Sequence, residues 1–368
     1  MKKKIAILGS RGIPNHYSGF EQLAEYLAQG LVKMGYEVSV YNSHDHPYQE
    51  KTWNGVNIIH CHDPEYKMGT FGQFIYDLNC IKDSRKRNFD LIFQLGYTSS
   101  TVWFWYLPKG SKIATNMDGL EWKRSKYSKP VQQFLKVAEW LGVIGSDRLI
   151  SDSLGIQAYL KKKYKKDSSF IPYGAHLFSD PNPEVLSEFN LKPGEYDMLV
   201  ARMEPENNIE MIIKGYLTSK RSRKLVVVGN TQKTPHGRYL KEQYQNENGV
   251  MFTEGIFDID KLNNIRHHCH LYFHGHSVGG TNPSLLEAMA SSALMAAHDN
   301  PFNKAILEGE AYYFSNPEDV TTAIETSNKA EKMQWITDNR KKITDKYTWD
   351  AIVKGYAQVI EELTNGKA

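Results

Sequence analysis

Short apolar runs alternate with longer amphipathic stretches along the first half of this sequence. The short runs predict β-strands, and the longer stretches carry apolar residues three or four positions apart, as a helix with one buried face requires. Leu23, Leu27 and Leu31, for example, share one face of a predicted helix. Strands are predicted at 4–8, 37–41, 90–95, 112–116 and 147–151, and helices at 21–34, 131–142 and 154–164. This order is typical of a parallel, doubly wound sheet.

The same alternation begins again in the second half. Strands are predicted at 198–201, 224–229, 271–273 and 294–297, and helices at 208–218 and 284–291. Pro172 and Gly174 interrupt an extended segment, which indicates a domain boundary. We therefore predict an α/β protein with two Rossmann-like domains, at 1–171 and 172–346. A C-terminal helix within 347–368 is expected to pack back on the first domain.

Composition supports this division. The chain has 368 residues, too many for one ordinary domain, and its 40% hydrophobic and 24% charged residues are typical of a globular protein. Three cysteines form no disulfide framework and indicate a reducing compartment. The sequence shows neither a secretory apolar segment nor an apolar run long enough to span a bilayer. We expect a cytoplasmic location, including the inner face of the cell membrane, and no nucleic-acid partner.

A glycine-containing loop follows the first predicted strand. It has the sequence Gly-Ser-Arg-Gly-Ile-Pro at 9–14, and Gly19 and Glu21 open the next helix. Glycines let a backbone approach a ligand, and a helix N-terminus favours anionic groups. The glycine spacing differs from the dinucleotide fingerprint, which argues against a dehydrogenase. A ligand-binding loop is favoured over a structural one, because ligands of parallel sheets bind at the carboxyl ends of strands.

Two loops of the second half have the composition of a phosphate site. Residues 201–208 contain Arg202, whose guanidinium fork fits phosphate oxygens; a surface ion pair is the alternative. Residues 274–284 are polar and glycine-rich and precede the apolar helix that carries Glu287. Backbone N–H groups at such a helix start bind phosphate, and Glu287 could accept hydrogen bonds from ribose hydroxyls. The alternative is a capped helix whose Glu287 only complements the dipole.

Three other polar segments carry weaker signals. The histidine–cysteine runs at 60–62 and 267–270 have metal-binding residue types, but adjacent residues diverge on a strand or helix, so no metal site is predicted. The lysines in 161–166 end a helix, where positive charge suits the dipole; a membrane-surface role is the alternative. Segment 118–124 follows a strand and could bind an acceptor or form a simple surface loop.

These motifs together resemble the large retaining GT-B glycosyltransferase family often called family 4. Segments 9–14 with 19–21, 116–124 and 274–289 look like its rhamnosyltransferase branch, and the resemblance covers essentially the whole chain. It implies two Rossmann-like domains facing across a cleft, and sugar transfer from a nucleoside diphosphate sugar to a hydroxyl with retained anomeric configuration. The implied donor is dTDP-rhamnose. The implied acceptor is a growing cell-surface polysaccharide or lipid-linked glycan, with peripheral membrane contact and no metal or other cofactor.

The resemblance also implies roles for individual residues. Arg202 and Asp118 would be catalytic. Donor-binding residues would be Gly12, Gly229, Asn230, Ile256, Phe257, His276, Gly280, Thr281, Asn282, Pro283 and Glu287. Acceptor-binding residues would be Gly19, Glu21, Glu121, Trp122 and Arg124.

Three positions depart from the family's pattern. Asn207 stands where a lysine usually follows the arginine, and Gly279 stands where the paired-glutamate motif has its first member. The stretch 116–118 lacks the histidine common in the first domain. Nucleotide binding survives these changes, but two alternatives stay open. They are a nucleotide-sugar epimerase or phosphorylase on the same scaffold, and a non-catalytic sugar-nucleotide-binding subunit.

Overall fold

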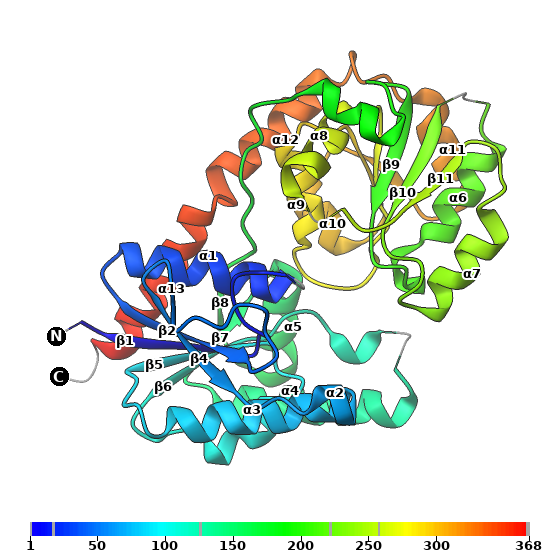
Figure 1. Ribbon diagram of the computed structural model, residues 1–368. Coiled ribbons are helices and arrows are strands. Elements are labelled where there is room, and N and C mark those ends of the chain that lie inside the picture. Colours follow the sequence, from blue (N-terminus) through cyan, green and yellow to red (C-terminus); the bar gives the residue numbers. More distant parts are fainter. Residues whose placement is uncertain (1, 17–18, 125–126, 221–222, 257, 366–368) are drawn as a thin grey trace. The chain divides into compact units, whose positions relative to one another are not determined.

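The computed structural model describes residues 2–16, 19–124, 127–220, 223–256 and 258–365. The chain divides into two compact α/β units (Figure 1). The first unit comprises 1–123, 127–173 and 349–368, and the second comprises 124–126 and 174–348. The sequence pattern predicts the main divisions after residues 171 and 346, whereas the structure has them after 173 and 348.

The described part of the first unit contains an eight-stranded sheet in the order β3-β4-β2-β1-β5-β6-β7-β8. Neighbouring strands are parallel, except that β3 is antiparallel to β4. Ile5, Ile7 and Ile92 have no exposed surface, as expected of strands covered on both faces. The strands are β1 (Lys4–Leu8), β2 (Glu37–Ser43), β3 (Thr52–Trp53), β4 (Val56–Cys61), β5 (Leu91–Leu95), β6 (Lys112–Asn116), β7 (Arg148–Ser151) and β8 (Ser168–Phe170).

The C-terminal helix α13 (Trp349–Thr364) belongs to this first unit. The ring of Trp349 stacks on Tyr26 of α1 with 4.4 Å between centroids, and the Tyr356 hydroxyl accepts a hydrogen bond from Asn116 Nδ2 at 3.1 Å. These contacts hold α13 against α1 and against the carboxyl end of β6. The other helices are α1 (Gly19–Lys33), α2 (Glu65–Met68), α3 (Thr70–Ser84), η1 (Thr101–Tyr106), η2 (Glu121–Lys123), α4 (Lys129–Gly145) and α5 (Leu154–Tyr164).

The sheet of the second unit has six parallel strands in its described part, in the order β11-β10-β9-β12-β13-β14. Numbered within this unit, the order is 3-2-1-4-5-6, that of dinucleotide-binding Rossmann folds. Two Rossmann-like α/β domains confirm the predicted fold class. The strands are β9 (Tyr196–Val200), β10 (Lys224–Val228), β11 (Val250–Thr253), β12 (Tyr272–His274), β13 (Met295–His298) and β14 (Tyr312–Phe314).

Helices cover both faces of this second sheet (Figure 1). Leu199, Ile212, Val227 and Phe273 lie in one buried cluster between the sheet and its helices. The helices are η3 (Pro183–Phe189), η4 (Pro205–Asn207), α6 (Ile209–Thr218), α7 (Pro235–Tyr244), α8 (Ile259–His268), α9 (Pro283–Ala290), α10 (Pro301–Leu307), α11 (Pro317–Thr326) and α12 (Met333–Lys346).

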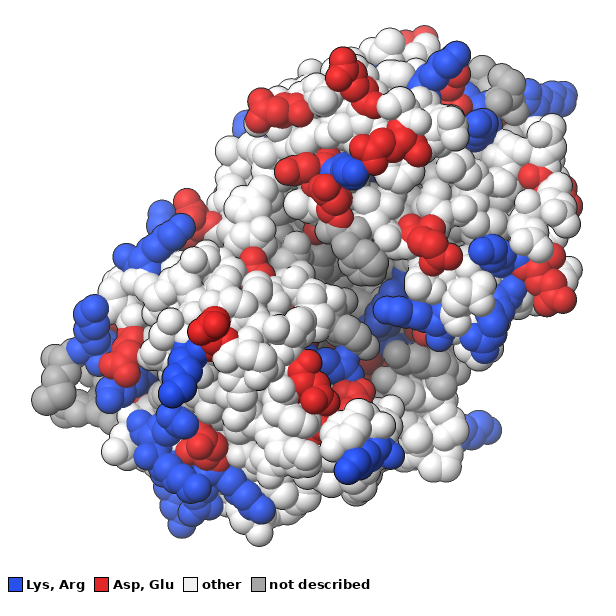
Figure 2. All heavy atoms as spheres, viewed as in Figure 1, with Lys and Arg blue, Asp and Glu red and all other residues white. Residues whose placement is uncertain are grey.

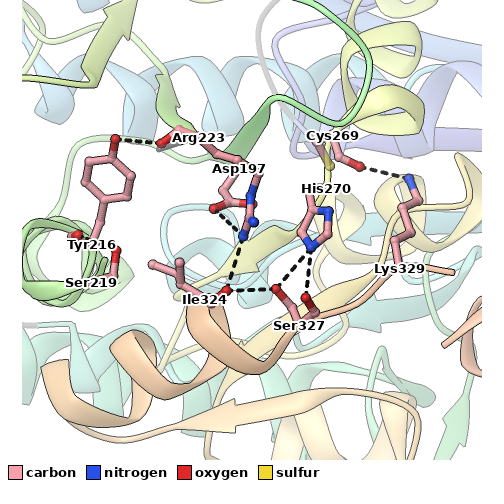
Figure 3. A network of polar contacts seen from close by, with 9 residues as sticks. All are labelled: Asp197, Tyr216, Ser219, Arg223, Cys269, His270, Ile324, Ser327 and Lys329. Atoms are coloured by element: carbon pink, nitrogen blue, oxygen red, sulfur yellow. Dashed lines mark hydrogen bonds and ion pairs between the residues drawn. The ribbon is translucent and has the colours of Figure 1, made fainter. Parts of the chain in front are cut away.

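A network of hydrogen bonds and ion pairs links the amino-terminal ends of strands in the second sheet (Figure 3). Asp197, fully buried on β9, accepts from Arg223 Nε at 3.1 Å, and the same guanidinium donates to the Ile324 carbonyl. Lys329 Nζ donates to the Cys269 carbonyl at 2.8 Å, next to the start of β12. The side chains at this edge of the sheet are therefore bonded to other protein groups. The carboxyl ends of the strands, where ligands of parallel sheets bind, lie at the opposite edge.

Candidate functional site

The switch point of the second sheet lies between β9 and β12, where the strand order reverses. In such sheets ligands bind outside the carboxyl ends of the two strands that flank this point. The loop after β9 contains Arg202, and the loop after β12 is the glycine-rich segment 275–282. The topology therefore brings together two loops that lie about 70 residues apart in sequence.

Hydrogen bonds join these two loops directly. The Glu206 carbonyl accepts from both the backbone N–H and the hydroxyl of Ser277, at 3.0 and 2.8 Å. Asn208 Nδ2 donates to the Gly275 carbonyl at 2.8 Å. A Cβ on Gly275 would lie 2.1 Å from the Asn207 carbonyl oxygen, so only glycine allows this approach.

Asn207, at the family's lysine position, has a structural role in this arrangement. Its side chain is buried, and Nδ2 donates to the Arg202 carbonyl at 2.7 Å. The amide thus shapes the loop that presents Arg202 instead of adding a second cation.

Arg202 itself is exposed. Among the described residues, no carboxylate lies within ion-pair distance of its guanidinium. Its fork of N–H donors is therefore available to an anionic ligand, as the sequence predicts.

Two histidines lie at the start of the glycine-rich loop. The rings of His274 and His276 stack, with 4.4 Å between centroids. Burial lowers the pKa of His276 to about 3, with further contributions from the positive charges of Arg202 and Arg124. His276 is therefore neutral at physiological pH. Its Nδ1 is buried without a hydrogen-bond partner in the described part of the chain, so the ring could bond to a ligand.

The glycine-rich loop ends in a capped helix. Asn282 is the N-cap of α9 and accepts from the Ser284 N–H at 3.0 Å, and Pro283 is the first helical residue. Thr281 is buried, and the space around the Cα of Gly279 is open. The structure thus has the helix cap expected if the segment is purely structural, and also the open, polar loop expected of a phosphate site. The cap satisfies one N–H, and a helix start has four N–H groups without helical partners.

Glu287 is bound by a side chain that the sequence did not indicate. Its Oε2 lies 2.7 Å from Nη2 of Arg266, a residue of α8 with 1% of its surface exposed. Arg266 Nη1 also donates to Asn263 Oδ1 at 3.0 Å. The buried guanidinium therefore fixes the position of the Glu287 carboxylate. No motif marks Arg266, because nothing in the sequence shows that α8 lies beside α9.

The end of β10 packs against the Arg202 loop. Gly229 has a φ of +155°, and a Cβ on it would lie 2.2 Å from the Ala201 carbonyl oxygen. Asn230 Oδ1 accepts from the backbone of Gln232 at 2.9 Å, so this side chain shapes its own turn. Ile256 is partly buried after β11, and Phe257 lies outside the described residues.

The first sheet repeats this geometry between β1 and β5. A Cβ on Gly12, whose φ is +124°, would lie 2.3 Å from the side chain of Asn42, which bonds to both the N–H and the carbonyl of Ile13. The buried Glu21 accepts from the Arg11 N–H at 2.8 Å, and the Arg11 guanidinium pairs with Glu65 at 2.5 Å. The buried Glu21 carboxylate thus stabilises the conformation of the loop at 9–14. Gly19 is the first residue of α1.

The Asp118 loop follows β6 of the same sheet. Asp118 adopts a φ of +45°, and its N–H donates to Asn116 Oδ1 at 2.9 Å. Glu121 is buried, and its N–H donates to the Tyr97 hydroxyl at 3.1 Å. The loop is therefore held in one shape by neighbouring side chains.

The two remaining residues of this segment have different surroundings. Trp122 Nε1 donates at 3.0 Å to Glu139, a buried carboxylate that also accepts from Tyr159. Arg124 falls in the short segment assigned to the second unit, where its Nη1 lies 3.7 Å from Glu206 Oε1. The sequence groups both residues in one acceptor loop of the first domain, whereas the boundary between the two units falls between them.

Of the weaker motifs, the lysine run at 161–166 is paired at two of its five lysines. Lys161 bonds to Asp167 and Lys163 to Glu139, both within 2.8 Å. His60 Nε2 lies 2.9 Å from the Tyr48 carbonyl. Within the described residues, no group of three or more His, Cys, Asp or Glu side chains is placed to hold a metal ion. In the same part of the chain, every helix is too short or too polar to cross a bilayer.

Each half of the chain matches a different protein-family model. Residues 187–349 match the family described as Glycosyl transferases group 1. Residues 2–176 match the family described as a domain of unknown function, DUF1972. Among curated protein sequences, none matches this chain.

Solved structures show the same fold along the whole chain. Sucrose-phosphate synthase from Thermosynechococcus elongatus is 16% identical, with a TM-score of 0.83 and full coverage of both chains. The Anabaena protein Alr3699/HepE, in complex with UDP-glucose, is 13% identical, with a TM-score of 0.74 and coverage of 98% of this chain and 100% of that one. Trehalose-6-phosphate synthase OtsA is 11% identical, with a TM-score of 0.74 and coverage of 98% and 99%.

The fold and the domain match define the class of this protein. It is a glycosyltransferase with the GT-B fold, and residues 187–349 match the Glycosyl transferases group 1 family. The predicted enzyme class is confirmed at this level.

Proposed function

We propose that this enzyme transfers a sugar from a nucleoside diphosphate sugar to a hydroxyl of a glycan acceptor, with retention of configuration. The main support is the junction of the Arg202 loop with the glycine-rich loop at the switch point of the Glycosyl transferases group 1 domain. The structural neighbour HepE was solved with UDP-glucose, which supports a donor of this chemical class.

The second domain binds the donor in this proposal. Arg202 and backbone N–H groups of residues 279–283 contact the diphosphate, His276 lies beside it, and Glu287, fixed by Arg266, accepts hydrogen bonds from the ribose. Gly229, Asn230 and Ile256 lie at the neighbouring strand ends toward the nucleoside. The first domain binds the acceptor, with Asp118 and Glu121 on its β6 loop.

The reaction follows from the charge that develops during bond cleavage. The leaving diphosphate becomes more negative as the glycosidic bond breaks, so donors aimed at its oxygens stabilise the transition state more than the ground state. The acceptor oxygen attacks on the same face, and its proton passes to the departing phosphate oxygen. This route requires neither a protein nucleophile nor a metal ion, and we expect activity to persist with a chelator present.

The donor sugar is proposed from sequence alone. Segments 9–21, 116–124 and 274–289 resemble rhamnosyltransferases, so the proposed donor is dTDP-rhamnose and the acceptor a growing surface polysaccharide or lipid-linked glycan.

A transfer assay tests the proposal by measuring release of dTDP from dTDP-rhamnose with a panel of glycan acceptors. We expect Arg202→Ala to lower kcat/KM more than about tenfold, the loss of roughly 1.4 kcal/mol of transition-state stabilisation. Arg202→Lys should fall between it and the wild type, because lysine keeps the charge but not the fork.

Lys341→Ala is the matched control, since Lys341 is an exposed cation on α12 of the same domain. Wild-type turnover by Arg202→Ala would remove Arg202 from the mechanism. A sugar product formed without acceptor would indicate an epimerase, and tight nucleotide binding without turnover would indicate a non-catalytic subunit.

A further inference from the structure

One helix of the first domain is apolar on both of its faces. The inner face of α4, with Leu135, Ala138 and Val143, is buried. On its outer face Phe134, Val137 and Trp140 follow one another at three-residue spacing and are 41%, 52% and 49% exposed. An amphipathic surface helix should carry polar side chains there. This outer face is therefore a candidate interaction surface.

Neighbouring elements extend this apolar surface. The ring of Phe134 packs edge-on against Phe74 of α3 with 5.6 Å between centroids, and Phe74 stacks on Phe71, which is 62% exposed. The adjacent η1 adds Trp105 and Tyr106, 57% and 38% exposed. We call these six exposed side chains the aromatic face: Phe71, Trp105, Tyr106, Phe134, Val137 and Trp140.

Basic residues border the aromatic face. Arg85, just after α3, donates from Nη1 to the Tyr106 carbonyl at 3.3 Å, and the exposed Lys82 and Lys86 lie beside it in sequence. Lys109 follows η1, and Lys129 begins α4. Figure 2 shows Lys and Arg side chains gathered at the lower left of the first domain, the end at which Figure 1 places the start of β5.

Two of the nearby carboxylates are already engaged, and a third, Asp90, is exposed beside Arg85 and Lys109. Glu139, on α4, is buried and accepts from Trp122 and Tyr159. Asp83, on α3, is bonded to Arg87 and to the Tyr41 hydroxyl. The border of the aromatic face therefore has a net positive charge.

We infer that the aromatic face docks the first domain on an anionic lipid surface. Tryptophan, tyrosine and phenylalanine insert at the boundary between headgroups and acyl chains, and lysine and arginine attract anionic headgroups. A second copy of the chain is disfavoured as occupant, because self-association through this face brings two basic borders together. The inference is independent of the donor and of the acceptor.

Vesicle co-sedimentation of the full chain tests this inference. The wild type should bind vesicles that contain phosphatidylglycerol and show little binding to phosphatidylcholine alone. We expect Phe134→Ser/Trp140→Ser to bind at least tenfold more weakly, and Arg85→Gln/Lys86→Gln at least fivefold more weakly at low salt. The matched control is Leu217→Ser/Tyr239→Ser, two apolar side chains of the second domain that are 37% and 41% exposed. It should bind like the wild type.

Circular dichroism and Tm establish that the variants are folded, and Val137→Gln provides a milder substitution in the same face. Absence of wild-type binding to the anionic vesicles would overturn the inference, as would equal weakening by the control pair. Sedimentation velocity tests whether a second copy of the chain occupies the aromatic face. A dimer that Phe134→Ser/Trp140→Ser dissociates, with no vesicle binding by the wild type, would assign the face to a second copy.

Discussion

A buried ion pair, Arg266 with Glu287, lies near the proposed donor site. Arg266 and Glu287 come from different helices, and Arg266 is almost completely buried. A charge in such a place is stable only with a partner, and removing one member leaves the other desolvated and unpaired. Glu287 is therefore fixed before any ligand arrives, which would lower the entropy lost in the proposed binding of a ribose.

Replacing Arg266 tests this pairing. We expect Arg266→Met to lower the free energy of unfolding by about 3 kcal/mol, because Glu287 loses its buried partner. The double variant Arg266→Met/Glu287→Gln should recover part of that loss, since the amide carries no charge. Urea denaturation of the three proteins measures both effects. Equal stability of Arg266→Met and the wild type would show that the pair contributes nothing.

His276 links stability to pH through its burial. Its pKa is lowered to about 3 in the folded protein, whereas the ring titrates near 6.5 when unfolded. Between these values the unfolded chain binds a proton that the native protein does not, so stability falls as the pH is lowered through this window. Burial also lowers the pKa of His274, which adds to the same trend.

The variant His276→Asn should therefore show a shallower loss of Tm than the wild type between pH 7 and pH 4.5. The amide has no titration in this range, while His274 keeps its own contribution in both proteins. Thermal unfolding at a series of pH values checks this, and identical pH profiles would contradict the burial of a neutral ring at this position.

The contact between the Arg202 loop and the glycine-rich loop requires a glycine at position 275. Gly275 allows the Asn207 carbonyl to approach, and a methyl group at this position would overlap it. Gly275→Ala should separate the two loops and weaken nucleotide binding more than about tenfold. Gly309→Ala is the control, because a Cβ there meets nothing within 4 Å and Gly309 lies in the same unit but outside both loops. Titration calorimetry with dTDP compares them, and equal affinity of Gly275→Ala and the wild type would refute the steric argument.

Hydrophobic period predicts helices and strands well where one face is plainly apolar. The strands at 4–8 and 112–116 and the helix at 154–164 have the predicted bounds, and the other predicted elements differ by a few residues. The pattern did not predict α8 or α12, whose sequences are mostly polar, nor the short β14. For α4 the helix was predicted, but apolar residues on both faces conceal which one is buried.

The arrangement of the chain explains which site residues could be predicted. Arg202 and the loop at 274–284 follow buried strands, and the carboxyl ends of parallel strands share one edge of the sheet. Contacts between separate helices follow no local rule, so Arg266 could not be paired with Glu287 from sequence. For the C-terminal helix, by contrast, the sequence predicts packing on the first domain, and α13 belongs to that unit, with contacts from Trp349 and Tyr356.

The central claim is that the switch point of the second domain binds a nucleoside diphosphate sugar. Thermal unfolding of the full chain with dTDP, dTDP-rhamnose, UDP and UDP-glucose tests it most directly, because a ligand that binds the native state raises Tm. The account predicts the largest rise with the dTDP compounds, and a strongly reduced rise in Arg202→Ala but not in Lys341→Ala. Unchanged Tm with every nucleotide, or equal rises in the wild type and Arg202→Ala, would contradict it.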